Sequence, residues 1–199
     1  MKRVLALPGY YLPGYKGGGP IRSLANLVES LGDEICFYIL TQDRDLGDRA
    51  PYPDLTPDVW QRVGKAQVMY VSPPQMTVRN WPGLLAQAEY DLVYLNSFFS
   101  LQTRLTLLLR RSGKLPHRPV VLAPRGEFSP GALGLRSLKK KLYIQTVMRM
   151  GLYDDLVWHA TSATEIADMR SVIGRFIPDL TSRTVLAPNL AAPSSVPAS

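Results

Sequence analysis

The sequence predicts an α/β fold in which helices flank a doubly wound, mainly parallel β-sheet. Short apolar runs, typical of strands that are buried on both faces, alternate along the chain with segments whose apolar residues recur at helical spacing. This alternation favours right-handed βαβ units. The 199 residues are 46% hydrophobic and 20% charged, which is enough for one substantial core. We therefore expect one domain over residues 1–189.

The first strand and helix lie on either side of a glycine-rich loop. Residues 4–7 form a continuous apolar run and predict a buried strand. Pro20 suits the first turn of a helix, and apolar residues recur from there at helical spacing. The inward positions of this helix are Ile21, Leu24, Leu27, Val28 and Leu31.

The same patterns predict the remaining elements in order. The Asp- and Pro-rich segment 41–57 is expected to be a loop. Ser100 and Ser162 are expected to cap helices, and Glu165 follows Ser162 at capping-box spacing. Strands are expected at 34–40, 66–71, 91–95, 119–122, 156–160 and 184–187, and helices at 81–89, 100–112, 135–150 and 162–173.

The helix expected at 135–150 has two distinct sides. Its apolar side would carry Leu138, Leu142, Tyr143, Thr146, Val147 and Met150. Arg136, Lys139 and Lys140 would lie on the opposite side, and we expect these three residues to contact an anionic surface.

Basic residues are concentrated in one part of the chain, whose net charge is +7. Residues 101–150 contain eleven Lys or Arg and a single acidic residue, Glu127. This concentration indicates an anionic partner, either phosphate groups or an acidic membrane face. Solvated surface is the alternative explanation. We expect no nucleic-acid partner, because aromatic stacking residues are not interleaved with the lysines.

Composition excludes several other classes of protein. No apolar run approaches the ~20 residues that span a bilayer. Lys2 and Arg3 resemble the start of a signal peptide, but the apolar run after them ends at Pro8. We therefore expect a cytoplasmic protein that could lie peripherally on the inner face of the plasma membrane. Cys36 is the only cysteine, which excludes an internal disulfide and a thiolate metal cluster, and we predict no metal site.

Gly17, Gly18 and Gly19 suggest a phosphate-facing loop. A backbone without side chains that leads into a helix can present N–H groups and the positive end of the helix dipole to an anion. A merely flexible loop is the alternative. A nicotinamide site is less favoured, because the glycines do not follow the G-x-G-x-x-G order, although Asp43 lies roughly where a ribose-binding acid would fall.

Three unusual loops follow predicted strands, at residues 17–19, 96–100 and 124–134. Ligands of doubly wound sheets bind beyond the carboxyl ends of the strands. The sequence therefore predicts a site where these three loops meet.

In an ordered set of short motifs the chain resembles the N-terminal half of family 4 glycosyltransferases, which are retaining enzymes of the two-domain GT-B type. The matching residues are 17–24 (GGGPIRSL), 91–96 (DLVYLN), 123–126 (APRG), 158–162 (WHATS) with Glu165 beyond, and Pro188-Asn189.

The resemblance implies a Rossmann-like domain that supplies the acceptor site, with a nucleotide-sugar bound between it and a C-terminal domain. Gly17, Gly18 and Gly19 would face the donor diphosphate, and Arg125 and Glu127 would line the acceptor side. Asn96 stands where many members have a histidine. It could contact the transferred sugar but could not act as an acid or base, because an amide does not titrate near neutral pH.

The function that this resemblance implies is that of the acceptor-binding half of a hexosyltransferase-like enzyme in envelope polysaccharide synthesis. Its substrates would be a nucleotide-sugar and a glycan or lipid-linked acceptor, with no cofactor. The chain would need a C-terminal donor-binding domain, in cis or in trans, and residues 190–199 would be a tail or the start of the linker to it. A non-catalytic Rossmann-like module that binds a nucleotide or polyanion is the alternative. We expect His159 to be a buried, hydrogen-bonded residue.

Overall fold

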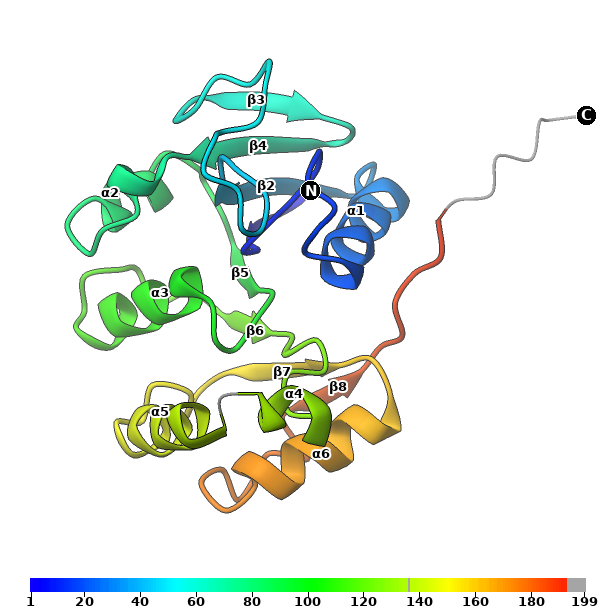
Figure 1. Ribbon diagram of the computed structural model, residues 1–199, viewed down its shortest axis with the longest axis vertical. Coiled ribbons are helices and arrows are strands. Elements are labelled where there is room, and N and C mark those ends of the chain that lie inside the picture. The colour runs from blue at the N-terminus through cyan, green and yellow to red at the C-terminus, as the bar shows by residue number, and fades with distance from the viewer. Residues whose placement is uncertain (136, 193–199) are drawn as a thin grey trace, which may run out of the picture.

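The computed structural model describes residues 1–135 and 137–192 and contains one eight-stranded sheet (Figure 1). The strand order is β3-β4-β2-β1-β5-β6-β7-β8, and every neighbouring pair is parallel except β3 and β4. The order reverses at β1, whose neighbours are β2 and β5. The predicted Rossmann-like, doubly wound fold is confirmed.

The predicted strands and helices occur in the predicted order, with bounds close to those expected. The strands are β1 Lys2–Leu7, β2 Ile35–Gln42, β3 Trp60–Val63, β4 Ala66–Val71, β5 Leu92–Leu95, β6 Val120–Leu122, β7 Val157–Ala160 and β8 Thr184–Leu186. The helices are α1 Gly19–Leu31, the short 3-10 helix η1 Pro73–Gln75, α2 Trp81–Leu85, α3 Leu101–Arg111, α4 Pro130–Gly134, α5 Ser137–Arg149 and α6 Ala163–Ile173.

The two faces of the sheet bury two separate apolar cores. Leu5 and Leu7 of β1 point into one core, whereas Val4 and Ala6 point into the other, because successive side chains of a strand alternate between faces. Helices α2, α3, α5 and α6 contribute to the first core, and α1 contributes to the second. Figure 1 shows α2, α3 and α5 on one side of the sheet and α1 on the other.

Strand β3 and helices η1 and α4 were not predicted from the sequence. Strand β3 pairs antiparallel with β4 through a turn at Gly64, whose φ is 57°. Its four residues are short of apolar side chains, so they carry little strand signal. Helix α4 has only five residues and lies within the segment predicted as a loop. The sequence also made α2 too long, since the helix ends at Leu85 rather than at residue 89.

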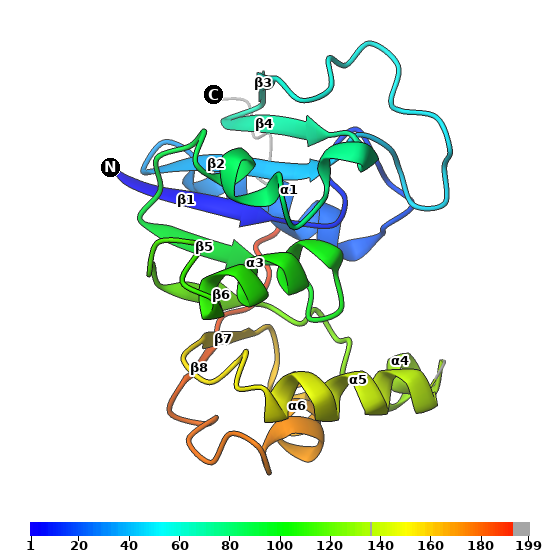
Figure 2. The same ribbon diagram turned by 90° about the vertical axis from the view of Figure 1, so that its left-hand side faces the viewer.

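The apolar side predicted for α5 is only partly right. Val147 is buried and Tyr143 packs against the core, as predicted, but Leu138, Leu142, Thr146 and Met150 are exposed. The side chains that α5 buries are Ile144, Val147 and Met148, whereas Leu138 and Leu142 are 82% and 66% exposed. The reason is the length of the helix relative to the sheet. The first turns of α5 extend past the carboxyl ends of the strands, so no sheet lies beneath them (Figure 2).

An aromatic cluster connects the end of β5 to the elements beside it. Phe98 is fully buried, and its ring stacks on Tyr153 with the centroids 4.5 Å apart. The same ring meets Phe128, from the loop after β6, edge-on at 4.9 Å and lies 6.4 Å from Trp158 of β7. Because Phe98 lies in the loop after β5 and Phe128 in the loop after β6, the cluster packs these two loops against the core.

Past β8 the chain runs beside α1 (Figure 1). The Asn26 side-chain amide donates a 3.0 Å hydrogen bond to the carbonyl of Leu190. Residues 190–192 form no helix or strand, and residues 193–199 of the predicted tail lie outside the described residues. Among the residues that the structure describes, no helix is long and apolar enough to cross a membrane.

Phe98→Ala tests how far the aromatic cluster carries the stability of the domain. Removing this buried ring should lower the free energy of unfolding by about 3–5 kcal/mol, measured by chemical denaturation. The matched control is Leu108→Ala on α3, where a 40% exposed side chain should change the stability by only about 0.5 kcal/mol. Similar losses in both variants would show that the cluster is not a major part of the core.

Candidate functional site

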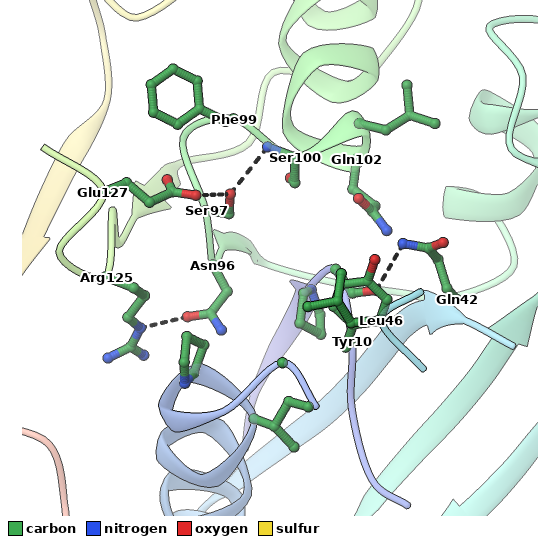
Figure 3. Close-up of a pocket in the computed structure, with 16 residues that line it drawn as sticks. Tyr10, Gln42, Leu46, Asn96, Ser97, Phe99, Ser100, Gln102, Arg125 and Glu127 are labelled. Carbon is green, nitrogen blue, oxygen red and sulfur yellow. Dashed lines mark hydrogen bonds between the residues drawn. The ribbon is translucent and has the colours of Figure 1, made fainter. Parts of the chain in front are cut away.

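The loops after β1, β5 and β6 meet around one cleft of about 380 Å³ (Figure 3). Gly17 comes from the first loop, Asn96 and Ser97 from the second, and Arg125 and Glu127 from the third. The three strands are neighbours in the sheet, so their carboxyl ends deliver these loops to one place. The structure thus brings together the three loops that the sequence predicted would meet.

A second cavity of about 320 Å³ lies next to the cleft. Gly19 and Pro20 of α1 line one side of it, and residues 161–165 at the start of α6 line the other. Pro20 and Arg125 line both cavities. Arg125 therefore stands at the boundary between the two spaces.

Three neutral side chains hold the Arg125 guanidinium. Nε donates to Asn96 Oδ1 at 2.7 Å, Nη1 to Asn189 Oδ1 at 2.6 Å, and Nη2 to the Tyr94 hydroxyl at 2.8 Å. Within residues 1–135 and 137–192 no carboxylate forms an ion pair with Arg125, and two of its five N–H groups are left without a protein acceptor. Its positive charge is therefore available to a bound anion.

The backbone around Arg125 is fixed in an unusual conformation. Arg125 has a φ of 57°, in the left-handed region that non-glycine residues seldom adopt, and Gly126 follows with a φ of 75°. The buried Glu165 carboxylate holds this turn, because its Oε1 accepts the Gly126 N–H at 2.7 Å while Oε2 accepts the Thr161 N–H, also at 2.7 Å. Local strain is thus compensated by a hydrogen bond to Glu165 in the first turn of α6, and such strained residues cluster at functional sites.

A chain of hydrogen bonds behind Arg125 fixes the tautomer of His159. The Ala187 carbonyl can only accept, so His159 Nε2, 2.8 Å away, carries the proton. Nδ1 then accepts from the Tyr94 hydroxyl, also at 2.8 Å. Burial lowers the pKa of His159, although the bond to Ala187 opposes this. His159 is therefore hydrogen-bonded, as predicted, but it is half-buried rather than buried.

Glu127 lines the main cleft but is itself held by the loop after β5. Its Oε1 accepts from Ser97 Oγ at 2.6 Å, and its Oε2 accepts the Phe98 N–H. Burial raises the pKa of this carboxyl, while the two hydrogen bonds oppose the shift. Asn96 is also buried, and its Nδ2 remains as a donor because Arg125 occupies its oxygen (Figure 3).

The three glycines lie at the start of α1 but do not form a full phosphate cradle. Gly17 lines the main cleft and Gly19 the second cavity, while Gly18 adopts a φ of 70° as the N-cap. The Gly18 N–H donates to Tyr15 O and the Ile21 N–H to Gly18 O, and Pro20 has no N–H. Between residues 18 and 21, only Gly19 can therefore offer its N–H to an anion.

The anchoring of this long loop was not predicted from the sequence. The buried Asp45 carboxylate accepts the N–H groups of Tyr15 at 2.8 Å, Lys16 at 3.1 Å and Leu46 at 2.8 Å. Burial opposes ionisation, yet these three donors keep the pKa of Asp45 below its ordinary value. Gly14 packs so closely here that a Cβ atom would lie 2.9 Å from Tyr11 O. The only sign of it in the sequence is an acidic residue, Asp45, three positions beyond the end of β2.

Asp43 is not placed to bind a ribose. It is buried, its carboxylate pairs with Arg44 Nε at 2.7 Å, and it lines neither cavity. This arrangement further weakens the nicotinamide interpretation. In the part of the chain that the structure describes, no group of three or more His, Cys, Asp or Glu side chains could hold a metal ion.

Of the residues expected to contact an anionic surface, Lys139 and Lys140 lie on α5 and do not line the cleft. Lys139 is exposed. Lys140 turns back toward the protein, where Nζ donates to Ala132 O and lies 5.3 Å from the centroid of the Phe99 ring. Arg136 lies outside the described residues.

Neither the protein-family models nor the curated proteins contain a match to this chain.

The tautomer of His159 can be tested by long-range ¹H–¹⁵N NMR. We expect Nε2 to carry the proton and Nδ1 to be unprotonated, with a pKa below the ordinary His value of ~6.5. The stability that the neutral ring contributes would be present above that value and lost as pH falls through the lowered pKa. The exposed His117 provides the reference signals. A proton on Nδ1 would contradict the assigned hydrogen bonds.

Glu127→Gln tests the raised pKa of the buried carboxyl. In the wild type, the raised pKa favours folding below the ordinary Glu pKa of ~4.3, and this contribution is lost as pH rises through the raised pKa. The amide does not titrate, so the Tm of the variant relative to that of the wild type should rise as the pH is raised from ~4.3 through the raised pKa of Glu127. Glu34→Gln removes an exposed carboxyl as a control. A Tm difference that is constant with pH would contradict the shift.

Proposed function

We propose that this chain is the acceptor-binding half of a retaining glycosyltransferase. It would hold a glycan or a lipid-linked sugar while a nucleotide-sugar donor is presented by a second domain, in cis or in trans. The envelope polysaccharides are the class of product that we propose. The resemblance of the ordered motifs to family 4 enzymes supports this proposal, and so does the chemistry of the cleft.

The lining of the cleft suits a sugar. Sugar hydroxyls both donate and accept hydrogen bonds, while the C–H faces of the ring pack on apolar or aromatic surfaces. The cleft supplies side-chain amides, hydroxyls, one carboxylate and two aromatic rings within a single space (Figure 3). These side chains are Gln42, Asn96, Gln102, Ser97, Ser100, Glu127, Tyr10 and Phe99. This mixture is the observation that carries the proposal.

Arg125 adds a preference for a negatively charged group. Its two remaining N–H groups could bind a phosphate oxygen at the boundary of the two cavities. A diphosphate-linked sugar would satisfy both features, with its phosphate on Arg125 and its sugar among the amides. Asn96 would then donate from Nδ2 to a sugar hydroxyl and would hold Arg125 through its oxygen.

We propose a second domain because the departing nucleoside diphosphate carries negative charge that this chain has few groups to stabilise. Departure of a nucleoside diphosphate leaves negative charge that an efficient enzyme must stabilise. Among the residues that the structure describes, Arg125 is the only cation that lines either cavity, and few backbone N–H groups at the start of α1 are free. We therefore propose that the donor-binding domain supplies the further positive groups.

A non-catalytic module that binds a nucleotide or polyanion is the second candidate. The observation in its favour is that the Arg125 network is complete within this chain, because Asn96, Asn189 and Tyr94 hold the guanidinium without help. Such a module would bind UDP-glucose or GDP-mannose by itself. An acceptor domain would instead bind a sugar diphosphate acceptor by itself and bind nucleotide-sugars tightly only with the second domain.

Titration calorimetry with a short-chain polyprenyl diphosphate sugar tests the proposal. The wild-type chain should bind it, and Arg125→Gln should weaken binding about tenfold or more through the loss of charge-assisted hydrogen bonds. Arg125→Lys keeps the charge but loses the planar fork, and an intermediate affinity is expected. Arg79→Gln, at an exposed arginine, is the matched control and should bind like the wild type.

Two results would count against the acceptor role. If the sugar diphosphate binds equally to the wild type and to Arg125→Gln, Arg125 does not hold its phosphate. If the chain alone binds UDP-glucose or GDP-mannose tightly and shows no affinity for the sugar diphosphate, the binding module becomes the better description.

A further inference from the structure

The connection between α4 and α5 exposes leucines that the fold does not use. Leu135, Leu138 and Leu142 are 72%, 82% and 66% exposed, and we call these three residues the leucine ridge. Leu138 and Leu142 are one helical turn apart on the side of α5 that faces away from the buried Ile144, Val147 and Met148. Isolated exposed leucines are common, but two on one side of a helix, with a third just before that helix in the chain, suggest a surface for interaction.

Lysines flank the leucine ridge. On the helix, Lys139 lies to one side of the column formed by Leu138 and Leu142, and Lys141 lies to the other. Both lysines are exposed, and neither forms an ion pair within residues 1–135 and 137–192. From residue 128 to residue 153 the sequence contains no Asp or Glu. The surface is therefore apolar along its centre and purely basic at its edges.

We propose that the leucine ridge, with Lys139 and Lys141, docks this protein on an anionic lipid surface. The leucines would enter the boundary between headgroups and acyl chains, ~5–10 Å deep, and the lysines would remain among the phosphates. The same arrangement, an apolar strip with basic edges, is what an interfacial helix requires. The positive charge of the lysines complements the negative charge of the lipid phosphates. The apolar leucines suit the boundary between the headgroups and the acyl chains.

Two other kinds of partner fit less well. A nucleic acid would be bound through phosphates and stacked bases, and leucine side chains offer neither a charge nor a stacking face. The core of a protein interface is depleted in lysine, whereas here the lysines adjoin the most exposed leucines. Lys140 is not part of the surface, because its ammonium group bonds to Ala132 O and lies over Phe99.

Docking in this way would bring the cleft close to the membrane. Helix α4 and the first turns of α5 lie beyond the carboxyl ends of the strands, at the edge where the cleft opens (Figure 2). Phe99 lines the cleft, and its ring lies 5.6 Å from that of Tyr143 on α5. A sugar diphosphate anchored in the bilayer could then reach Arg125. The lipid contact itself does not depend on the proposed transferase function.

Vesicle co-sedimentation tests the docking surface. The full chain should bind vesicles of equimolar phosphatidylcholine and phosphatidylglycerol, bind phosphatidylcholine vesicles weakly, and dissociate as salt is raised. Leu138→Gln combined with Leu142→Gln should reduce partitioning about tenfold or more, and Lys139→Gln with Lys141→Gln should do the same. Far-UV circular dichroism should show an unchanged fold, because all four side chains are exposed.

The controls remove similar side chains elsewhere. Leu108→Gln with Leu186→Gln changes two exposed leucines of other elements, and Lys2→Gln with Arg79→Gln removes two distant charges. The leucine control should partition onto vesicles within about twofold of the wild type. The charge control should lose little of its vesicle binding. The proposal is overturned if the leucine variant binds like the wild type, or if the chain ignores anionic vesicles. It is also overturned if the ridge instead mediates a dimer or an oligonucleotide contact that the same variants abolish while vesicle binding persists.

Discussion

The parallel sheet, buried on both of its faces, is the constraint on which the rest of this structure depends. Its strand interiors have to be apolar, as in β1, where Leu5 and Ala6 are fully buried on opposite sides. Polar groups that must act together can therefore gather only where strands end. Because β1, β5, β6, β7 and β8 are successive neighbours, the loops at their carboxyl ends form one continuous polar edge, and both cavities lie there.

Arg125 is the centre of that edge. Side chains from the carboxyl ends of two strands, β5 and β8, hold its guanidinium, and Glu165 holds the backbone that follows it. None of the three partners is charged, so the hydrogen bonds orient the cation without neutralising it. A group that is positioned in this way loses little conformational entropy when it binds an anion, which is the physical basis of preorganisation. The left-handed backbone at residue 125 is one cost of that arrangement.

Most of the fold and part of the site could be predicted from the sequence, since apolar periodicity reports burial directly. Strand β4 and the caps at Ser100 and Ser162 follow from local patterns. The inward side of α5 could not be fully predicted in this way, because periodicity does not reveal that the first turns of the helix extend past the carboxyl ends of the strands. The roles of Asp45 and Glu165 also could not, because their partners are backbone N–H groups brought close only by the fold. The predicted phosphate loop offers fewer free donors than its glycines suggested, since its own turns use them.

We propose that the polar edge around Arg125 binds a sugar diphosphate. The most direct measurement is a ¹H–¹⁵N correlation spectrum of the chain during titration with a short-chain polyprenyl diphosphate sugar. We expect saturable shifts at the amides of residues 17–19, 21, 96–102 and 125–127, which surround the two cavities. Shifts confined to α5, or an unchanged spectrum at these three loops, would contradict it.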